Sequence, residues 1–448
     1  MANSSGNLNA RGYCSDGPAE YGEVLGAVAL AQPNSLQPYP LRCSGLFKCR
    51  HGIVDSTRQG ISAELICVHP LAGVGHRAIL TDMSTAIPQR DPETTALLLR
   101  EWLSVKLVGA GTVMAEDSQV VKIINLDVPK AGFSNETILA TAQWRTPLGE
   151  IHEREIVLRI EPTRHQLFLA PDALRQAAVM NVLQPYIRVP EVLFAESRAD
   201  ILGAPFYVMQ RVRGKVTSDV PSWHSRGWVT ELSEVQRSEL HDNALRELVK
   251  LHRVDTSDQA FDFLRTEGNV NDLQHYVYWL EQMYEWCEPV RVHSTDVIEM
   301  AMRFITDEIP DDPRSGLVWG DARMGNILFD DSRKVASMLD WEGATLGPCD
   351  IDVAWWALFD EFLCESLGIT RLSGIVPRRE MYLRYCDLGG EISPAIGYFE
   401  VLAGLLFTLI NSRLAHLLVE SGASTETFAA SIVDRAAKLT RQAIERLS

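Results

Sequence analysis

Three residues in the C-terminal half of the chain combine the side chains that phosphoryl transfer requires. Asp321 and Asn326 form an Asp-x4-Asn pattern, and Asp340 follows fourteen residues after Asn326, at the end of a short apolar stretch. A carboxylate beside an attacking hydroxyl can orient it and accept its proton, while an Asn and a second Asp supply hard oxygen ligands for Mg²⁺. Asp321 and Asn326 could instead be turn formers in a hairpin, and Asp340 could be a carboxylate at the end of a strand without a further role. Together they predict phosphoryl transfer.

The stretches around these residues resemble a known family. Trp319–Asn326 reads WGDARMGN, Leu339–Glu342 reads LDWE, and Gly347–Ala354 reads GPCDIDVA. These motifs resemble the aminoglycoside phosphotransferase family, whose fold is protein-kinase-like, and most closely its actinobacterial "WGDARxGN" branch, which is related to the kinase-like domain of some acyl-CoA dehydrogenases. The spacing from Asp321 to Asn326 also equals that of the kinase catalytic loop. The resemblance implies an α+β, two-lobed fold, with a small five-stranded antiparallel-sheet N-lobe, a mostly helical C-lobe, and ATP and Mg²⁺ in the cleft.

The resemblance also implies roles for individual residues. Asp321 matches the catalytic base, and Asn326 and Asp340 match the Mg²⁺ ligands. Arg323 and Trp355 are candidates for contact with substrate or phosphate, although Arg323 could instead pair with a surface carboxylate and Trp355 could pack in the core. The candidate ATP-binding residues are Gly132, Phe133, Ser134 and Asn135 in a turn, Arg159 on a strand, and Met209, Gln210 and Val212 in the lobe-connecting hinge. Asp352 is expected to hold the catalytic loop through hydrogen bonds, and His252 to be structural.

Three departures from the family pattern favour an alternative. Trp319 replaces the usual His, Arg159 replaces Lys, and Gln176 stands near the position of the Glu that pairs with that Lys. Arg and Lys are not interchangeable as phosphate ligands. Arg159 could face solvent, and Gln176 is expected on a helix surface. The alternative is therefore a catalytically inactive pseudokinase that acts as a nucleotide-binding or scaffold protein.

The periodicity of the sequence predicts the elements that position these residues. Strands are expected at 119–127, at 137–144, at a segment ending with 156–159, and at 206–209, and helices at 93–106, 171–183, 235–253, 273–287, 295–307, 353–365 and 393–420. Asp360 and Glu361 are expected on a solvated helix face. The predicted organisation is an N-terminal extension over 1–88, a kinase-like N-lobe over 89–212 and a helical C-lobe over 213–448. The extension is interpreted as disordered or as an artefact of the gene start, and a small folded regulatory domain is its alternative.

Composition narrows the classes of partner. The formal net charge is −17, which disfavours general binding to nucleic acid or an anionic membrane. The longest apolar run, 401–410, is about half of the ~20 residues that a membrane-spanning helix needs. The eight cysteines contain no CxxC pair, so reduced thiols and a cytoplasmic location are expected. The predicted function is ATP- and Mg²⁺-dependent phosphorylation of a hydroxyl on a small molecule, with an aminoglycoside-like or a hydroxyacyl-CoA-like acceptor.

Overall fold

The computed structural model describes residues 90–109, 121–128, 136–146, 148–265, 271–311 and 314–447. All of them belong to the unit Gly73–Ser448. The predicted extension over 1–88 and the predicted phosphate-binding turn Gly132–Asn135 lie outside the described residues.

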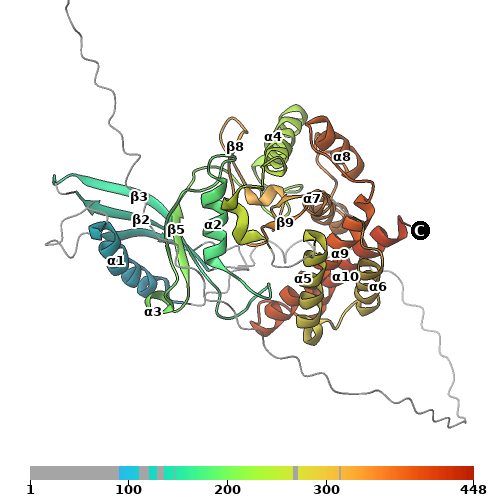
Figure 1. The fold of residues 1–448 in the computed structure, drawn as a ribbon, viewed down its shortest axis with the longest axis horizontal. Helices are drawn as coiled ribbons and strands as arrows, with labels where there is room; N and C mark the ends of the chain where they lie inside the picture. Colours follow the sequence, from blue (N-terminus) through green and yellow to red (C-terminus); the bar gives the residue numbers. More distant parts are fainter. Residues whose placement is uncertain are drawn as a thin grey trace, which may run out of the picture. The chain divides into compact units, whose positions relative to one another are not determined.

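The N-terminal lobe is built on a five-stranded antiparallel sheet, which confirms the predicted fold class (Figure 1). Its strands are β1 (Lys122–Asp127), β2 (Glu136–Arg145), β3 (Ile151–Ile160), β4 (Val192–Glu196) and β5 (Phe206–Gln210), in the spatial order β1-β2-β3-β5-β4. β5 lies between β3 and β4, and four consecutive residues of it, Phe206–Met209, are buried. A central strand covered on both faces is apolar on both faces, which explains its unbroken hydrophobic run.

The two faces of the sheet have different partners. Ile156, Leu158 and Ile160 of β3 belong to the core under α1 (Pro92–Gly109), together with Trp102 of that helix. The alternate residue Val157 points to the opposite face, into the core that includes α2 (Ala173–Leu183). Since side chains alternate along a strand, Arg159 lies on this second face, toward α2 and the C-terminal lobe.

The C-terminal lobe is mainly helical. Its helices are α4 (Glu234–His252), α5 (Asp272–Trp286), α6 (Thr295–Asp307), α7 (Asp350–Leu363), α8 (Arg378–Asp387), α9 (Ile396–Glu420) and α10 (Glu426–Glu445), and the short helix α3 (Ala199–Leu202) belongs to the other lobe. The lobe also contains two antiparallel two-stranded sheets. One pairs β6 (Ser315–Val318) with β9 (Thr345–Pro348), and the other pairs β7 (Ile327–Phe329) with β8 (Val335–Met338). α3, α8 and α10 are absent from the sequence-based prediction, which places the other described α-helices within a few residues.

Local sequence accounts for where the long helices begin. Ser233 caps α4 and Asn271 caps α5, each in a reciprocal capping box with a Gln three residues later.

α9 is long and apolar enough to cross a membrane by length and composition, but 78% of its most apolar window is buried. It therefore serves as the core helix of this lobe, packed against α7, α6 and α10.

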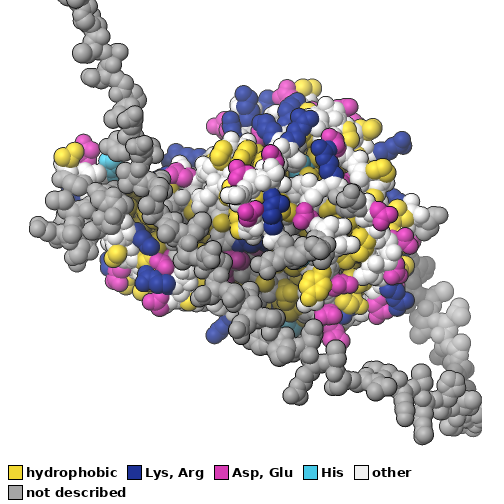
Figure 2. Space-filling view, viewed as in Figure 1, with side chains coloured by type: hydrophobic (Ala, Val, Ile, Leu, Met, Phe, Trp, Pro, Cys, Tyr) yellow, Lys and Arg dark blue, Asp and Glu magenta, His cyan; other side chains and the backbone are white. Residues whose placement is uncertain are grey.

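Charged side chains of both signs cover the molecule. On the face that Figure 2 shows, Lys and Arg side chains gather near α4 and α8, with Asp and Glu side chains interspersed among them. This mixture gives that face no continuous basic stripe of the kind that tracks a nucleic-acid backbone.

Candidate active site

The loop that carries Asp321 connects β6 to β7 and is shaped by a close backbone contact. Gly320 has a φ of +88°, and a Cβ built on it would lie 2.3 Å from the carbonyl oxygen of Gly343. Only glycine satisfies both conditions, because a positive φ strains other residues and no side-chain atom fits against the neighbouring backbone. The glycine therefore fixes the direction in which the next residue, Asp321, leaves the strand.

Asp352 holds this loop from the first turn of α7. Its carboxylate is completely buried and accepts the backbone N–H groups of Trp319 at 2.6 Å and Gly320 at 2.8 Å. His252 Nε2 lies 3.0 Å from the same carboxylate, and His252 Nδ1 lies 2.6 Å from the Tyr385 hydroxyl. These contacts confirm the structural roles predicted for Asp352 and His252.

Trp319 joins the Asp321 loop to the turn that carries Asp340. Its side chain is completely buried, and its indole Nε1–H donates to the carbonyl oxygens of Leu339 at 2.9 Å and Asp340 at 3.1 Å. Its ring packs against that of Trp341, with centroids 5.5 Å apart. Trp319 is therefore the direct link between the two stretches that carry the predicted base and one of the predicted metal ligands.

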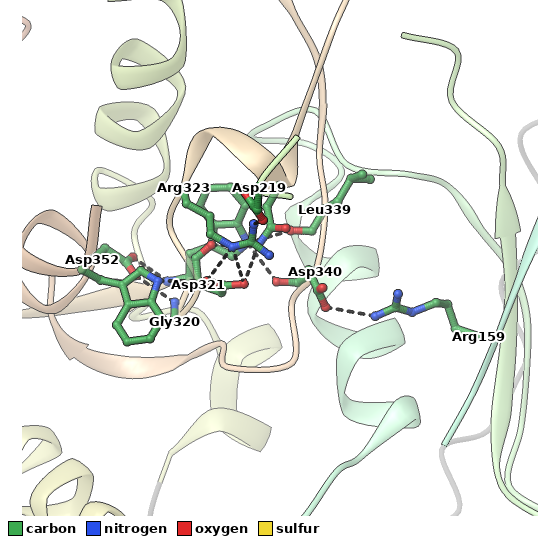
Figure 3. A network of polar contacts seen from close by, with 11 residues as sticks. Arg159, Asp219, Gly320, Asp321, Arg323, Leu339, Asp340 and Asp352 are labelled. Atoms are coloured by element: carbon green, nitrogen blue, oxygen red, sulfur yellow. Dashed lines mark hydrogen bonds and ion pairs between the residues drawn. The ribbon is translucent and has the colours of Figure 1, made fainter. Parts of the chain in front are cut away.

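Asp321 accepts hydrogen bonds from three side chains (Figure 3). The Nε–H of Arg323 lies 3.0 Å from Oδ1 and 2.9 Å from Oδ2. Asn326 Nδ2 donates to Oδ2 at 2.6 Å, and Trp355 Nε1 donates to Oδ1 at 2.9 Å. The structure thus brings the predicted Asp321, Asn326, Arg323 and Trp355 into one cluster. Arg323 also pairs with Asp219, and its guanidinium lies over the ring of Phe359.

Arg159 reaches across from the sheet to Asp340 (Figure 3). Its Nη2 donates to Asp340 Oδ1 at 3.0 Å and its Nη1 to Thr137 Oγ1 at 3.1 Å. Burial opposes the charge of Arg159, but Asp340, Tyr207 and Glu342 together outweigh it, so the pKa of the guanidinium lies above its usual range. The alternative of a solvent-facing strand residue is therefore wrong.

The partner expected for Arg159 on α2 is replaced by a neighbour on the sheet. Tyr207 stands opposite Arg159 in the β3–β5 register, and burial raises the pKa of its phenol to about 12. The Tyr207 hydroxyl donates to Gln176 Oε1 at 3.2 Å. Gln176 is only 2% exposed, so its expected position on a helix surface is wrong. The physical reason is that α2 packs directly on the sheet face that carries Arg159.

The predicted hinge begins with the last two residues of β5. Met209 is buried and pairs with Val157 of β3, and the backbone N–H of Gln210 donates to the Glu191 carbonyl at 2.8 Å. Val212 lies two residues past the strand. The first part of the hinge is thereby held by the sheet.

A small pocket adjoins the Asp321 cluster. Its lining includes Asp219, Trp223, Arg323, Trp356 and Phe359. Burial raises the pKa of Asp219, an effect that the charge of Arg323 opposes and that of Asp321 adds to. The pocket therefore places a second carboxylate next to the predicted base.

Asp360, which also lines the pocket, belongs to a hydrogen-bonded cluster. Atoms of His224, Asp360 and Cys364 lie within 4.8 Å of one another, which by distance alone could suit a metal ion. However, Leu372 N–H donates to His224 Nδ1, His224 Nε2 lies 2.8 Å from Asp360, and Arg371 pairs with the same carboxylate. These groups already satisfy one another, so the cluster is structural.

The two acidic residues expected on a solvated face belong to ion pairs instead. Asp360 pairs with Arg371, and Glu361 lies 3.3 Å from Arg378 in a half-buried pair. That expectation was wrong because α7 is covered by α8 and α9, and sequence periodicity does not predict how helices pack on one another.

The chemistry of the donor set suits a divalent cation. The amide nitrogen of Asn326 is used in hydrogen bonds to Asp321, which leaves its oxygen as the ligand atom. Asp340 has φ +59° and gives only Oδ1 to Arg159. One amide oxygen and one carboxylate are the hard ligands that Mg²⁺ prefers when phosphates and water complete its shell.

Sequence reasoning missed three residues of the site. Thr137 and Tyr207 flank Arg159 on neighbouring strands, and Asp219 binds Arg323. A register alignment of the predicted strands could have found the first two. Asp219 lies in a loop with no motif, so no sequence signal marked it.

A two-lobed fold with this Asp–Asn–Asp arrangement defines a class, the kinase-like phosphotransferase enzymes. The model of the phosphotransferase enzyme family matches residues 128–376, more than half of the chain. The chain therefore belongs to this family.

Individual relatives share part of the chain. Acyl-CoA dehydrogenase family member 10 of Mus musculus is 28% identical over 312 residues, covering 64% of this chain and 28% of that protein. Family member 11 of Homo sapiens is 24% identical over 336 residues, covering 72% of this chain and 39% of that protein. The chain thus spans less than two fifths of either relative. A solved protein from Ralstonia eutropha, classed among the aminoglycoside phosphotransferases, is 20% identical, with a TM-score of 0.53 over 76% of this chain and 97% of its own, and shares the fold.

Proposed function

We propose that this protein transfers the γ-phosphoryl group of ATP to a hydroxyl group of a small molecule, with Mg²⁺ as cofactor. The observation that carries the proposal is the joining of Asp321, Asn326 and Asp340 by Trp319 and by the polar contacts around them. The three side chains come from two loops, and Arg159 of the sheet binds one of them, Asp340.

The residues have distinct roles in this proposal. Asp321 orients the acceptor hydroxyl and takes its proton, while Asn326 and Asp340 hold the cation. Bound Mg²⁺ would offset negative charge on the phosphates. Arg159 contacts phosphate oxygens, for which its planar fork of N–H donors is well suited. Positioning and charge complementarity supply most of the rate.

The nucleotide base is proposed to lie at the hinge. The backbone C=O of Gln210 and the N–H of Val212 face adenine, and Met209 contributes apolar contact. The turn Gly132, Phe133, Ser134 and Asn135 covers the phosphates in this proposal, as the family resemblance implies.

The acceptor is proposed to be aminoglycoside-like or hydroxyacyl-CoA-like. The second class is supported by relatives that are named as acyl-CoA dehydrogenase family members. Arg323 and Trp355, which both touch Asp321, are the proposed contacts for the acceptor or the transferred group. A cytoplasmic location, without nucleic-acid or membrane partners, completes the proposal.

The test measures thermal unfolding of the full chain with and without Mg·ATP. A nucleotide at 100 times its dissociation constant should add about 2.7 kcal/mol of stability. We expect a Mg²⁺-dependent rise that Asp340→Asn abolishes, since Asn tolerates the positive φ of this turn but lacks the charge. Asp331→Asn, at a carboxylate that is 94% exposed, is the matched control and should keep the rise.

Turnover separates the enzyme from the pseudokinase. Asp321→Asn should retain the nucleotide-dependent rise and lose phosphoryl transfer to a panel of hydroxyl acceptors. A parent protein that binds Mg·ATP but transfers no phosphate, to water or to any acceptor, would favour the pseudokinase. A folded parent without any rise would refute nucleotide binding altogether.

A further inference from the structure

Three N–H donors surround the carboxylate of Asp321 and engage both of its oxygens in this structure. An ionised carboxylate offers about four lone-pair positions. The Nε–H of Arg323 is shared between the two oxygens, Asn326 Nδ2 contacts one and Trp355 Nε1 contacts the other. An acceptor hydroxyl that donates to Asp321 therefore competes with these donors, and it meets an uncontested oxygen only if one of them moves away.

Two of the donors are fixed by their surroundings. Asn326 is 5% exposed and also donates to the backbone oxygen of Asp321 at 3.0 Å. Trp355 is 5% exposed, and its ring packs edge-on against Phe407 with centroids 5.6 Å apart. Arg323 is different because its long side chain lines the pocket beside the site. It is the donor that can leave with a change of rotamers alone.

A second position for Arg323 exists on Asp219. Arg323 Nη1 already pairs with Asp219 Oδ2, whereas Asp219 Oδ1 is buried and has no hydrogen-bond partner. A carboxylate can bind a guanidinium through two parallel N–H···O contacts. The vacant oxygen is therefore the atom that would receive a second N–H of Arg323 after it leaves Asp321.

The neighbouring glycine keeps the space for this pair. A Cβ at Gly325 would lie 2.4 Å from Arg323 Nη1 and 2.8 Å from Asp219 Oδ1. Any larger residue at position 325 would push directly on the two groups that have to meet.

We propose that Asp219 is a positioning residue, which takes Arg323 onto both of its carboxylate oxygens and so frees Asp321 for the acceptor hydroxyl. The inference rests on the proposed function, since it concerns the same site and the same step. Asp219 does not touch the reacting atoms in this scheme. It acts only through Arg323, and that restriction makes the scheme testable.

The experiment is a double-mutant cycle on the full chain, with slow hydrolysis of Mg·ATP by water as the probe. Asp219→Asn should lower kcat about tenfold with an unchanged KM for ATP, because the loss of a charge-assisted bidentate contact corresponds to at least about a tenfold change. In an Arg323→Gln background, the same substitution should change kcat by less than twofold, since there is no guanidinium left to move.

Two results would overturn the role of Asp219. One is an undiminished kcat in Asp219→Asn. The other is an equal loss in the Arg323→Gln background, which is expected if Asp219 instead binds the acceptor itself. Thermal unfolding verifies that each variant folds, and Asp219→Ser replaces Asp219→Asn if the latter does not.

The failure of the proposed function has a different signature. The parent would then release no ADP above the level of Asp321→Asn, and Mg·ATP would not raise its unfolding temperature. If the parent is active and the effects of Asp219→Asn and Arg323→Gln on kcat are additive, only the role of Asp219 is refuted and the proposed function stands. Asp331→Asn, on the exposed side of the β7–β8 turn, should behave as the parent throughout.

Discussion

Asp352→Asn should destabilise the fold and impair catalysis together. The buried carboxylate accepts three hydrogen bonds, from Trp319 N–H, Gly320 N–H and His252. An amide in its place has one accepting oxygen, and its NH₂ group faces a donor. At least one charge-assisted bond is lost and one buried donor is left unpaired. The lost bond is worth about 1.5–3 kcal/mol and the unpaired donor about 1–3 kcal/mol, so we expect a loss of about 2.5–6 kcal/mol in the free energy of unfolding.

The same change should slow phosphoryl transfer through the position of the neighbouring residue. Trp319 and Gly320 directly precede Asp321, so their release moves the predicted base. A misplacement of about 1 Å can cost on the order of 100-fold in rate. KM for ATP should change little, since Arg159 and the hinge belong to the other lobe.

Urea unfolding and steady-state kinetics measure both effects. Asp331→Asn removes an exposed carboxylate and should stay within about 0.5 kcal/mol of the parent. An Asp352→Asn protein as stable as the parent would refute the reasoning. Lost activity at full stability would mean that Asp352 takes part in the chemistry rather than holding the loop.

Two further predictions concern stability. Gly320→Ala should lower the free energy of unfolding by at least about 3 kcal/mol, because it adds a severe backbone clash to the strain of a positive φ. Gly422→Ala, with φ +71° and open space around it, should lower it by only about 1 kcal/mol. Equal losses in urea unfolding would show that the clash at position 320 is relieved. Burial, with arginines nearby, lowers the pKa of His241 to about 3, so the native ring stays neutral while the unfolded chain binds a proton below about pH 6.5. His241 therefore contributes full stability above pH 6.5 and loses about 1.4 kcal/mol for each unit that the pH falls toward 3. His241→Gln should flatten the fall in unfolding free energy between pH 6 and pH 4 by that slope, and an unchanged slope would show that the buried ring is protonated in the native state.

Local signals predicted the elements and the central motif. The unbroken apolar run of Phe206–Met209 marks a covered strand, and the Asp-x4-Asn spacing places Asp321 and Asn326 in one loop. Such features depend on neighbours in sequence, so the residues themselves reveal them. The predicted helices and strands were correct for this reason within a few residues.

Features that depend on long-range packing were not predictable in this way. Gln176 is buried because α2 lies on the sheet, and Asp360 is paired because Arg371 folds back from a later loop. Asp219 precedes Arg323 by 104 residues. Nothing in the local sequence of any of these three residues identifies its partner.

The departures from the family pattern at Arg159 and Trp319 come with substitute contacts. The guanidinium of Arg159 binds two partners with different nitrogens: Nη1 donates to Thr137 on the adjacent strand and Nη2 to Asp340. It therefore does not depend on an acidic partner from α2, and Gln176 can accept the Tyr207 hydroxyl instead.

Trp319 likewise supplies a donor to the turn that contains Asp340, in addition to filling the space beneath the loop. A lost partner leaves its neighbour unsatisfied, and two buried nitrogens, Arg159 Nε and Gln176 Nε2, have no hydrogen-bond partner among the described residues. Against this, both principal changes, at Arg159 and at Trp319, come with hydrogen bonds to Asp340 or its backbone. These contacts hold a predicted metal ligand in place, so we expect turnover rather than nucleotide binding alone, and the Asp321→Asn comparison decides between the two.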